Sequence, residues 1–319
     1  MSSPARALPR LYLAPMAGIT DKVFRRLCFR HGCDGATTEM ISAQGFLTAP
    51  PDRNAYRFLL DRYPEEGPLS AQLFGSNPEY LARAAARLCD LGLYTGIDIN
   101  MGCPAQKVVG GQSGSALMKD VPLAASIVEA VRKSSMLPVT VKMRLGWDDE
   151  HKNAVAFARA MEAAGAEGLT VHGRTRMQQY AGKADWEMIG AVKAAVGIPV
   201  VANGDIVDGQ SAVRALEITG CDGLAVGRGA LGKPWIFDEI KAAFRGEPYE
   251  PPSYAAVVET ALGQAREMAA WKGERSAVLE MRKFFGWYIA GRRGAAQLRT
   301  QLNLAPTLSD AEKLLRSLE

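Results

Sequence analysis

Eight short apolar runs, separated by longer amphipathic segments, constrain the fold of this 319-residue chain more than any other feature. Short runs bounded by turn residues are typical of strands, and the spacing between them leaves room for one helix each. The expected strands are residues 11–14, 35–38, 69–74, 96–100, 139–144, 168–172, 200–203 and 223–227. Eight strands that are each followed by a helix predict an α/β fold of the closed parallel (βα)8 or TIM-barrel class.

Residues that begin and end helices lie between the expected strands. Asn77, Pro78 and Glu79 supply an N-cap, a proline at the first helical position and an acid in the first turn. Further helix starts are expected at Asp120, Asp185 and Asp208, and helix ends at Gly92, Gly165, Gly197 and Gly220. A doubly wound sheet is the alternative, but it usually carries a dinucleotide-binding glycine pattern after its first strand, which residues 14–18 lack.

A linker separates the barrel from a second domain. Residues 246–252 contain three prolines and one glycine, a composition typical of linkers. Residues 253–319 show only helical periodicity, with a break at Pro306 and Thr307 before a last short helix. We therefore expect a catalytic barrel over residues 1–246 and a helical domain over residues 253–319.

Composition argues against several classes of protein. No apolar run approaches the roughly 18 residues that a membrane span needs, and Pro15 breaks the apolar segment near the N-terminus, so we expect a cytoplasmic protein without a signal peptide. The five cysteines are odd in number and contain no C-x-x-C pair, which argues against a disulfide framework, a zinc ribbon or an iron–sulfur cluster. The net charge of +4 permits a polyanionic partner without requiring one. No obligate protein partner is evident.

The segment 96–104 places a thiol at the end of a strand. Gly102 and Pro104 stop the strand around Cys103, and ligands of parallel α/β proteins bind at such strand ends. Taken alone, an unpaired cysteine is more often a small buried hydrophobe. A functional role is favoured by the polar Asn100 and by the basic, glycine-rich loop that begins at Lys107.

Polar or conformationally permissive residues stand at nearly all the other strand ends. They are Pro15, Met16, Ala17, Glu39, Met40, Gln72, Lys142, Arg144, His172, Arg174, Asn203, Gly204, Asp205, Gly227 and Arg228. Lys142 lies in an otherwise apolar strand and suits an anionic ligand, although a lysine can also snorkel from a strand end. His172 could equally be a core histidine.

Glycines after the seventh and eighth strands predict a phosphate site. Residues 203–205 and 227–229 combine glycines for close backbone approach with an arginine for charge, and two tight barrel turns are the alternative. Residues 227–233 also match most of a P-loop, but Pro234 stands where a Ser or Thr would bind magnesium. We interpret this segment as a cradle for a single phosphate and expect no metal site.

These motifs together resemble the tRNA-dihydrouridine synthases, flavoproteins that reduce uridine in tRNA, and most closely their bacterial B-type branch. The resemblance covers essentially the whole chain and is carried by residues 13–18 (LAPMAG), 100–104 (NMGCP), 171–175 (VHGRT), 201–206 (VANGDI) and 227–229 (GRG). It implies a barrel that binds FMN and a helical domain that binds tRNA. By motif match, Cys103 corresponds to the catalytic acid, and the flavin pocket corresponds to Pro15, Met16, Ala17, Gln72, Lys142, His172, Asn203, Gly204, Asp205, Gly227 and Arg228.

The chemistry of uracil reduction assigns roles to these groups. Saturating the C5=C6 bond needs a hydride, which FMN can supply, and a proton. We expect flavin N5 to deliver the hydride to C6 and Cys103 to protonate C5, a role that requires a thiol protonated at neutral pH. Lys142 is expected near the flavin N1 and O2 edge, with His172 assisting. Because no dinucleotide-binding unit is evident, NADPH is expected to dock only transiently.

A cluster of cations indicates where tRNA binds. Residues 275–299 contain six cations and one acid, Glu280, interleaved with aromatic residues that we expect to belong mainly to the core. The residues expected to contact the substrate are Asn100, Lys107, Arg174, Arg282, Lys283, Arg292 and Arg293. One departure from the family is Phe284, which follows the Arg-Lys pair where relatives often carry His.

Two other functions stay open at this point. One is an FMN barrel that acts on a small pyrimidine, such as a dihydroorotate dehydrogenase, whose cysteine would act as a base. The basic helical domain counts against it, because a free base needs no such surface. The other is an RNA-binding module on a catalytically silent barrel, which a flavin absorbance spectrum would exclude.

We predict that reversing the charge of Arg292 and Arg293 weakens tRNA binding more than it slows flavin reduction. Cations that contact phosphates release counterions on binding, so the affinity should also fall steeply with salt. Binding titrations at several salt concentrations test this prediction. An unchanged affinity and an unchanged salt slope would remove these two arginines from the tRNA surface.

Overall fold

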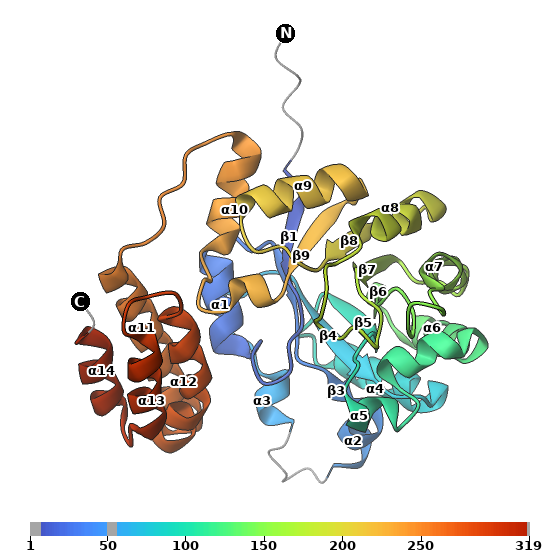
Figure 1. Cartoon of the computed structure of the whole chain (residues 1–319). Coiled ribbons are helices and arrows are strands. Elements are labelled where there is room, and N and C mark those ends of the chain that lie inside the picture. The colour runs from blue at the N-terminus through green and yellow to red at the C-terminus, as the bar shows by residue number, and fades with distance from the viewer. Residues whose placement is uncertain (1–7, 50–55, 318–319) are drawn as a thin grey trace.

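Eight parallel strands close into a barrel in the computed structural model, which describes residues 8–49 and 56–317 (Figure 1). The ring closes because β1 pairs with both β2 and β9, while β2 pairs with β4. Its strands are β1 (Arg10–Leu13), β2 (Gly35–Thr37), β4 (Leu69–Phe74), β5 (Gly96–Met101), β6 (Val139–Met143), β7 (Gly168–His172), β8 (Val200–Asn203) and β9 (Gly223–Val226). The short β3 (Ile41–Ser42) pairs with β4 outside the ring. The predicted barrel is confirmed.

Helices surround the barrel and begin at the predicted caps. The outer helices are α1 (Lys22–Arg30), α4 (Pro78–Asp90), α6 (Val121–Ser134), α7 (Ala154–Ala163), α8 (Trp186–Ala195), α9 (Gly209–Thr219) and α10 (Ile236–Arg245). The side chains of Asn77, Asp120, Asp185 and Asp208 each accept a hydrogen bond from a first-turn N–H. Shorter helices lie in the loops: α2 (Ala43–Thr48), α3 (Arg57–Leu60), α5 (Gln106–Val109), η1 (Gly114–Lys119) and η2 (Arg228–Ala230).

The strand register places polar side chains in one layer inside the barrel. Neighbouring positions across three strands are Gln72, Asp98 and Thr140, and the residues on either side of Asp98, Ile97 and Ile99, are fully buried in the apolar core. Because side chains alternate between the two faces of a strand, apolar residues pack under the helices while polar residues point inward. The interior therefore becomes polar toward the strand ends.

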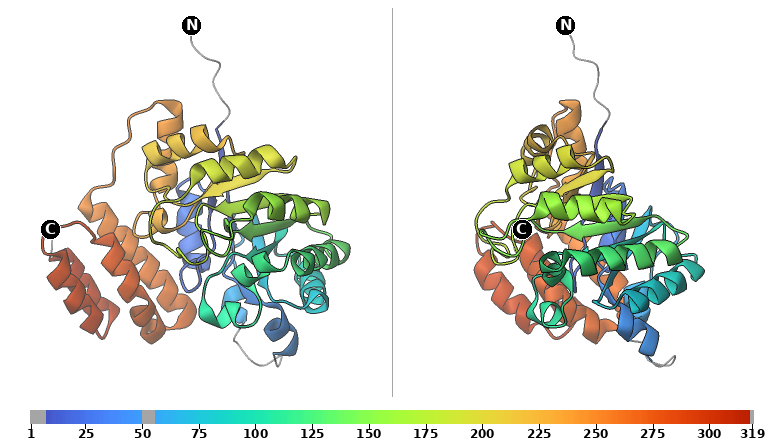
Figure 2. Two further views of the ribbon diagram at one scale, coloured as in Figure 1. Left: turned by 45° about the vertical axis from the view of Figure 1, so that its right-hand side comes forward. Right: turned by 90° about the vertical axis from the view of Figure 1, so that its right-hand side faces the viewer.

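Four helices form a bundle beside the barrel (Figures 1 and 2). They are α11 (Tyr254–Lys272), α12 (Glu274–Tyr288), α13 (Ala295–Leu304) and α14 (Leu308–Arg316), and α11 packs against α1. Residues 247–253 connect the bundle to the barrel without helix or strand. Among the residues that the structure describes, no helix has the length and apolar character needed to cross a membrane.

The contact between bundle and barrel combines aromatic and ionic interactions. Phe284 on α12 is fully buried, and its ring centroid lies 5.5 Å from that of Phe24 on α1. Trp271 Nε1 donates to Asp61 Oδ2 at 2.7 Å, and Lys272 lies 3.7 Å from Asp21. A histidine in place of Phe284 would bring a polar ring into this apolar contact, so the departure from the family motif fits the packing.

Gly232 allows the loop after β9 to approach the backbone of α12. Its φ is +68°, and a Cβ at this position would lie 2.4 Å from the carbonyl carbon of Trp287. Gly246, at the end of α10, has the same φ of +68° but no heavy atom within 4 Å of an added Cβ. The two glycines therefore share a conformation and differ in their surroundings.

We predict that Gly232→Ala lowers the free energy of unfolding by about 1–3 kcal/mol more than Gly246→Ala, because only the first adds a steric clash to the cost of positive φ. Denaturant unfolding of both variants measures the difference. Equal losses would mean that the loop and α12 are not packed as described.

Candidate active site

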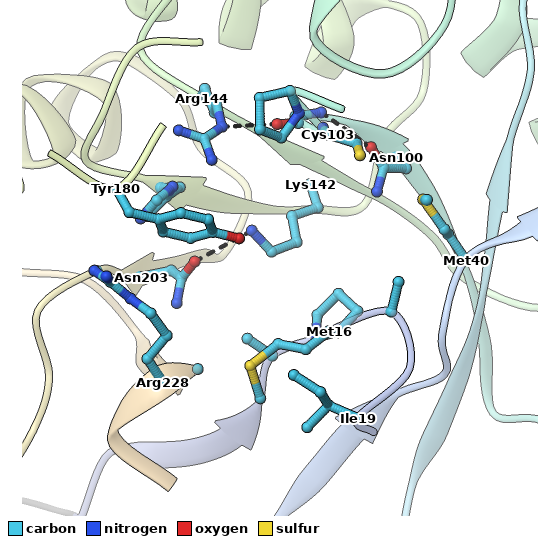
Figure 3. A pocket seen from close by; sticks show the side chains of 18 of the residues that line it. Met16, Ile19, Met40, Asn100, Cys103, Lys142, Arg144, Tyr180, Asn203 and Arg228 are labelled. Carbon is cyan, nitrogen blue, oxygen red and sulfur yellow. Dashed lines mark hydrogen bonds between the residues drawn. The ribbon is translucent and has the colours of Figure 1, made fainter. Parts of the chain in front are cut away.

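A cavity of about 770 Å³ opens at the carboxyl ends of the barrel strands (Figure 3). Each strand of the ring supplies it with at least one lining residue, from the C-terminal half of the strand or from the loop that follows. This volume lies within the range of about 300–1,000 Å³ that is usual for cofactor and ligand sites.

All the residues predicted from the sequence to bind the flavin or to supply a proton line this one cavity. They are Pro15, Met16, Ala17, Gln72, Cys103, Lys142, His172, Asn203, Gly204, Asp205, Gly227 and Arg228, and Asn100 joins them. The structure therefore brings these residues together at the strand ends, and the role of each stays a prediction.

Asn100 fixes the turn that carries Cys103. Its Oδ1 accepts hydrogen bonds from the backbone N–H of Cys103 at 2.9 Å and of Gly102 at 3.2 Å. The carbonyl of Cys103 accepts from the Ser115 hydroxyl at 3.0 Å. Cys103 is partly buried and lines the cavity, so its thiol is available to a ligand while its backbone is held on both sides.

Lys142 brings a partly desolvated cation to the cavity. Its Nζ donates to Asn203 Oδ1 at 3.2 Å (Figure 3), and Asn203 donates in turn to the carbonyl of Ala225 at 2.7 Å. Burial, with Arg144 nearby, lowers the pKa of Lys142 to about 8. At neutral pH the ammonium is still mostly charged, and a ligand with an anionic edge would stabilise this charge most.

His172 is neutral at physiological pH. Burial first, and then the positive charges of Lys142 and Arg144, hold the pKa of its imidazole far below the usual range. A neutral imidazole can donate or accept a hydrogen bond but adds no charge to the cavity.

Arg144 braces the rim of the cavity. Its Nε donates to the carbonyl of Gly102 at 2.7 Å, and its Nη1 donates to the carbonyls of Thr175 and Gln179 at 2.9 and 3.0 Å. Burial lowers the pKa of Arg144 to about 10, so it stays a cation at neutral pH. This side chain ties the cysteine turn to the loop between β7 and α8.

The loop after β8 closes one end of the cavity. Gly204 has a φ of +119°, and an added Cβ would lie 2.9 Å from Ala184 and 3.0 Å from the His172 ring. Asp205, also at positive φ, lies 2.8 Å from Arg174 and 3.6 Å from Arg228. Only glycine fits at position 204, which keeps this backbone close to the cavity.

The dihydrouridine synthase family model matches residues 12–318 of the chain. The chain belongs to the dihydrouridine synthase family. The family predicted from the motifs is thus confirmed.

Relatives match this family member over nearly their whole length. A probable tRNA-dihydrouridine synthase of Rickettsia bellii is 44% identical over 295 residues, which are 92% of this chain and 90% of the relative. The tRNA-dihydrouridine synthase B of Xanthomonas axonopodis pv. citri is 44% identical over 306 residues, 95% of this chain and 91% of its own. That of Pseudomonas aeruginosa is 44% identical over 295 residues, with 92% and 88% covered.

Six residues predicted to contact the substrate of this dihydrouridine synthase family member do not line the cavity. Lys107 is exposed on α5. Arg174 is 2% exposed and donates to Ala181, Gly182 and Asp205, so it braces a loop.

Three more of these residues lie on the helical bundle. Lys283 donates to the carbonyl of Gly18, and the Arg292 guanidinium lies 4.1 Å from the Tyr254 ring centroid. Arg293 is exposed beside it.

The sixth residue, Arg282, lines a second groove on the bundle. This groove of about 400 Å³ lies between α12 and α13, and its lining combines cations with an indole ring. The lining residues are Leu279, Arg282, Lys283, Gly286, Trp287, Arg299 and Asn303. The predicted cationic cluster is therefore divided between this groove, the contact with the barrel and the loop after α12.

Sequence reasoning did not assign several residues that line the cavity, among them Tyr180, Ile206 and Val207. Tyr180 lies in the loop between β7 and α8, is 56% exposed, and has the Arg228 guanidinium 4.6 Å from its ring centroid. Ile206 and Val207 add apolar surface to the cavity after β8. Tyr180 could not be found from the strand ends, because it lies far along the loop after β7. Ile206 and Val207 follow the predicted Asp205 directly and could have been included.

We predict that Lys142→Met raises the free energy of unfolding at pH 7 by about 1–3 kcal/mol, because it removes a buried charge while roughly keeping the volume. The folded-state pKa of Lys142 lies below its ordinary value, so wild-type stability should rise between about pH 8 and pH 10.5. The variant lacks this rise, so its gain in the free energy of unfolding over the wild type should vanish above about pH 10.5. Denaturant unfolding from pH 7 to 10.5 measures both effects. A variant that is less stable than the wild type at pH 7 would contradict the prediction that the buried charge of Lys142 lowers the stability.

Proposed function

We propose that this protein reduces uridine in tRNA to 5,6-dihydrouridine, with FMN bound in the barrel cavity and NADPH as the reductant. The observation that carries this proposal is the convergence of Cys103 with all the expected flavin positions on one cavity. Family membership and the relatives named tRNA-dihydrouridine synthase support the same substrate.

The cavity fits a flavin in size and in the chemistry of its lining. Apolar groups such as Met16 and Ile206 suit the faces of an isoalloxazine, while Gln72 and Asn203 offer amide groups to its polar edge. Lys142 supplies a cation that would stabilise an anionic ring, and Arg228 with the glycine backbone of residues 203–204 suits a phosphate. When bound, FMN would take electrons from NADPH and supply the hydride for uracil C6.

Cys103 is the proton donor in this proposal. Its sulfur would give a proton to C5 of the pyrimidine, on a turn that Asn100 and Ser115 hold in place. Arg144 also holds this turn through its hydrogen bond to the Gly102 carbonyl, and the neutral His172 can hydrogen-bond to a pyrimidine or flavin oxygen. The other side chains would hold the turn and orient the ligand, and only Cys103 would transfer a proton.

The surface around the cavity suits an RNA substrate. A uridine must leave its stack to enter a barrel mouth, and exposed aromatic and cationic side chains favour such a base. Tyr180 and Arg228 supply both kinds of group at the rim, and the groove with Arg282, Trp287 and Arg299 supplies them on the bundle. We therefore assign catalysis to residues 1–246 and tRNA binding mainly to residues 253–319, and a tRNA substrate agrees with the expected cytoplasmic location.

We predict that Cys103→Ala binds FMN and is reduced by NADPH at the wild-type rate, but forms dihydrouridine at least about 100-fold more slowly, the usual contribution of a general acid. Stopped-flow absorbance separates flavin reduction from its reoxidation by unmodified tRNA. Cys89→Ala is the matched control, because Cys89 is a partly buried cysteine outside the cavity, 3.5 Å from Ser135. Reoxidation of Cys103→Ala at the rate of the control would refute the assignment of the acid.

A further inference from the structure

We propose that Asp98 is a positioning residue that fixes the Cys103 turn through a relay of two side-chain amides, Gln72 and Asn100. This inference rests on the proposed function for its effect on catalysis, but the relay itself stands on hydrogen bonds within the barrel. Asp98 does not line the cavity, is 3% exposed and lies on β5 two residues before Asn100, beside Gln72 in the strand register.

A continuous series of short hydrogen bonds leads from Asp98 to the cysteine. The Asp98 carboxylate accepts from the Thr140 hydroxyl at Oδ1 and from Gln72 Nε2 at Oδ2, both at 2.7 Å. Gln72 Oε1 accepts from Asn100 Nδ2 at 2.8 Å. Asn100 Oδ1 then accepts from the N–H of Cys103 at 2.9 Å.

The two ends of the series determine which way each amide points. At one end the backbone N–H groups of Gly102 and Cys103 can only donate, so Asn100 must present its oxygen to them. At the other end an ionised carboxylate can only accept, so Gln72 must present its nitrogen to Asp98. Both conditions are met by one arrangement, in which every bond has a donor and an acceptor.

This arrangement also determines what the amides offer to a ligand. Both lone pairs of Asn100 Oδ1 are engaged by the turn, which leaves one N–H of this cavity-lining residue for a ligand. Gln72 keeps one N–H and one lone pair. A reversed relay would therefore change both the support of Cys103 and the groups that face the bound ring.

Substitutions at Asp98 can separate its acceptor role from its charge. Asp98→Asn keeps an oxygen for Gln72, because the Thr140 hydroxyl can turn to accept from the new amide. Asp98→Leu keeps the branched shape and the number of heavy atoms and has the same loss of charge, but it leaves Gln72 without an acceptor. Because the methyl groups of leucine are bulkier than the oxygens that they replace, a second experiment without leucine accompanies this comparison.

The first experiment compares Asp98→Asn and Asp98→Leu in flavin-loaded protein. We expect reoxidation by tRNA to fall about tenfold in Asp98→Leu and less than threefold in Asp98→Asn, with reduction by NADPH unchanged within about twofold in both. The limiting rate of Cys103 alkylation at high pH, followed by mass spectrometry, should change in the leucine variant only, because it reports the access to the thiol and not its pKa.

The second experiment reverses the relay and measures thermal unfolding. In Asn100→Asp, carboxylates stand at both ends and Gln72 can donate to only one, so the midpoint should fall by at least about 3 °C. Adding Asp98→Asn moves the single carboxylate to the turn and lets Gln72 turn around, which restores every bond. The double variant should therefore gain more over Asn100→Asp than Asp98→Asn gains over the wild type, because only the first comparison includes the restored bonds.

Equal effects of Asn and Leu at position 98 would overturn the relay. So would a double variant that gains no more over Asn100→Asp than Asp98→Asn gains over the wild type. A wild-type protein that forms no dihydrouridine would instead refute the proposed function. In that case the alkylation rates and unfolding midpoints would still decide whether the relay exists.

Discussion

The site depends on polar side chains that are buried inside a barrel and must pair with one another. A parallel barrel buries both faces of its strands, so each inward polar group loses water and needs a protein partner. Burial raises the pKa of Asp98 to about 6 and, in the opposite direction, lowers that of Lys142 to about 8. Hydrogen bonds to Gln72 and Asn203 offset part of the cost and hold these side chains in place.

The bundle supports the same site from outside. Gly18 lies directly after the cavity loop of residues 15–17, its N–H donates to Glu39, and its carbonyl accepts from Lys283 on α12. Burial raises the pKa of Glu39, whereas the N–H of Gly18 favours its charged form. A side chain expected to contact RNA therefore connects α12 to a loop that lines the cavity, so a displacement of the bundle would also displace this loop.

The sequence allowed the barrel and most of the cavity to be predicted, because both follow from local patterns. Strand ends, helix caps and glycines with positive φ are determined by neighbouring residues, and in a parallel barrel all the strand ends meet at one rim. Gln72, Lys142 and Asn203 could thus be placed together without a structure. The expected helical region after the linker also agrees with α11 to α14.

Contacts between distant segments could not be predicted in the same way. Arg174 follows a strand as Arg144 does, yet it does not line the cavity. It binds loop carbonyls and Asp205 instead, because the loop between β7 and α8 folds back over it. Tyr180 reaches the rim from that same loop. Local patterns identify the residues that can reach a site, whereas loop packing decides which of them do.

The charges at the cavity also explain why a neutral histidine suits this site. Lys142, Arg144 and Arg228 bring three cations to the lining, and Asp205 is the acid among the lining residues. A protonated His172 would add a fourth positive charge in a buried position, which its surroundings oppose. The cavity thus keeps an excess of positive charge, which suits an anionic ligand, while the imidazole stays able to accept as well as donate a hydrogen bond.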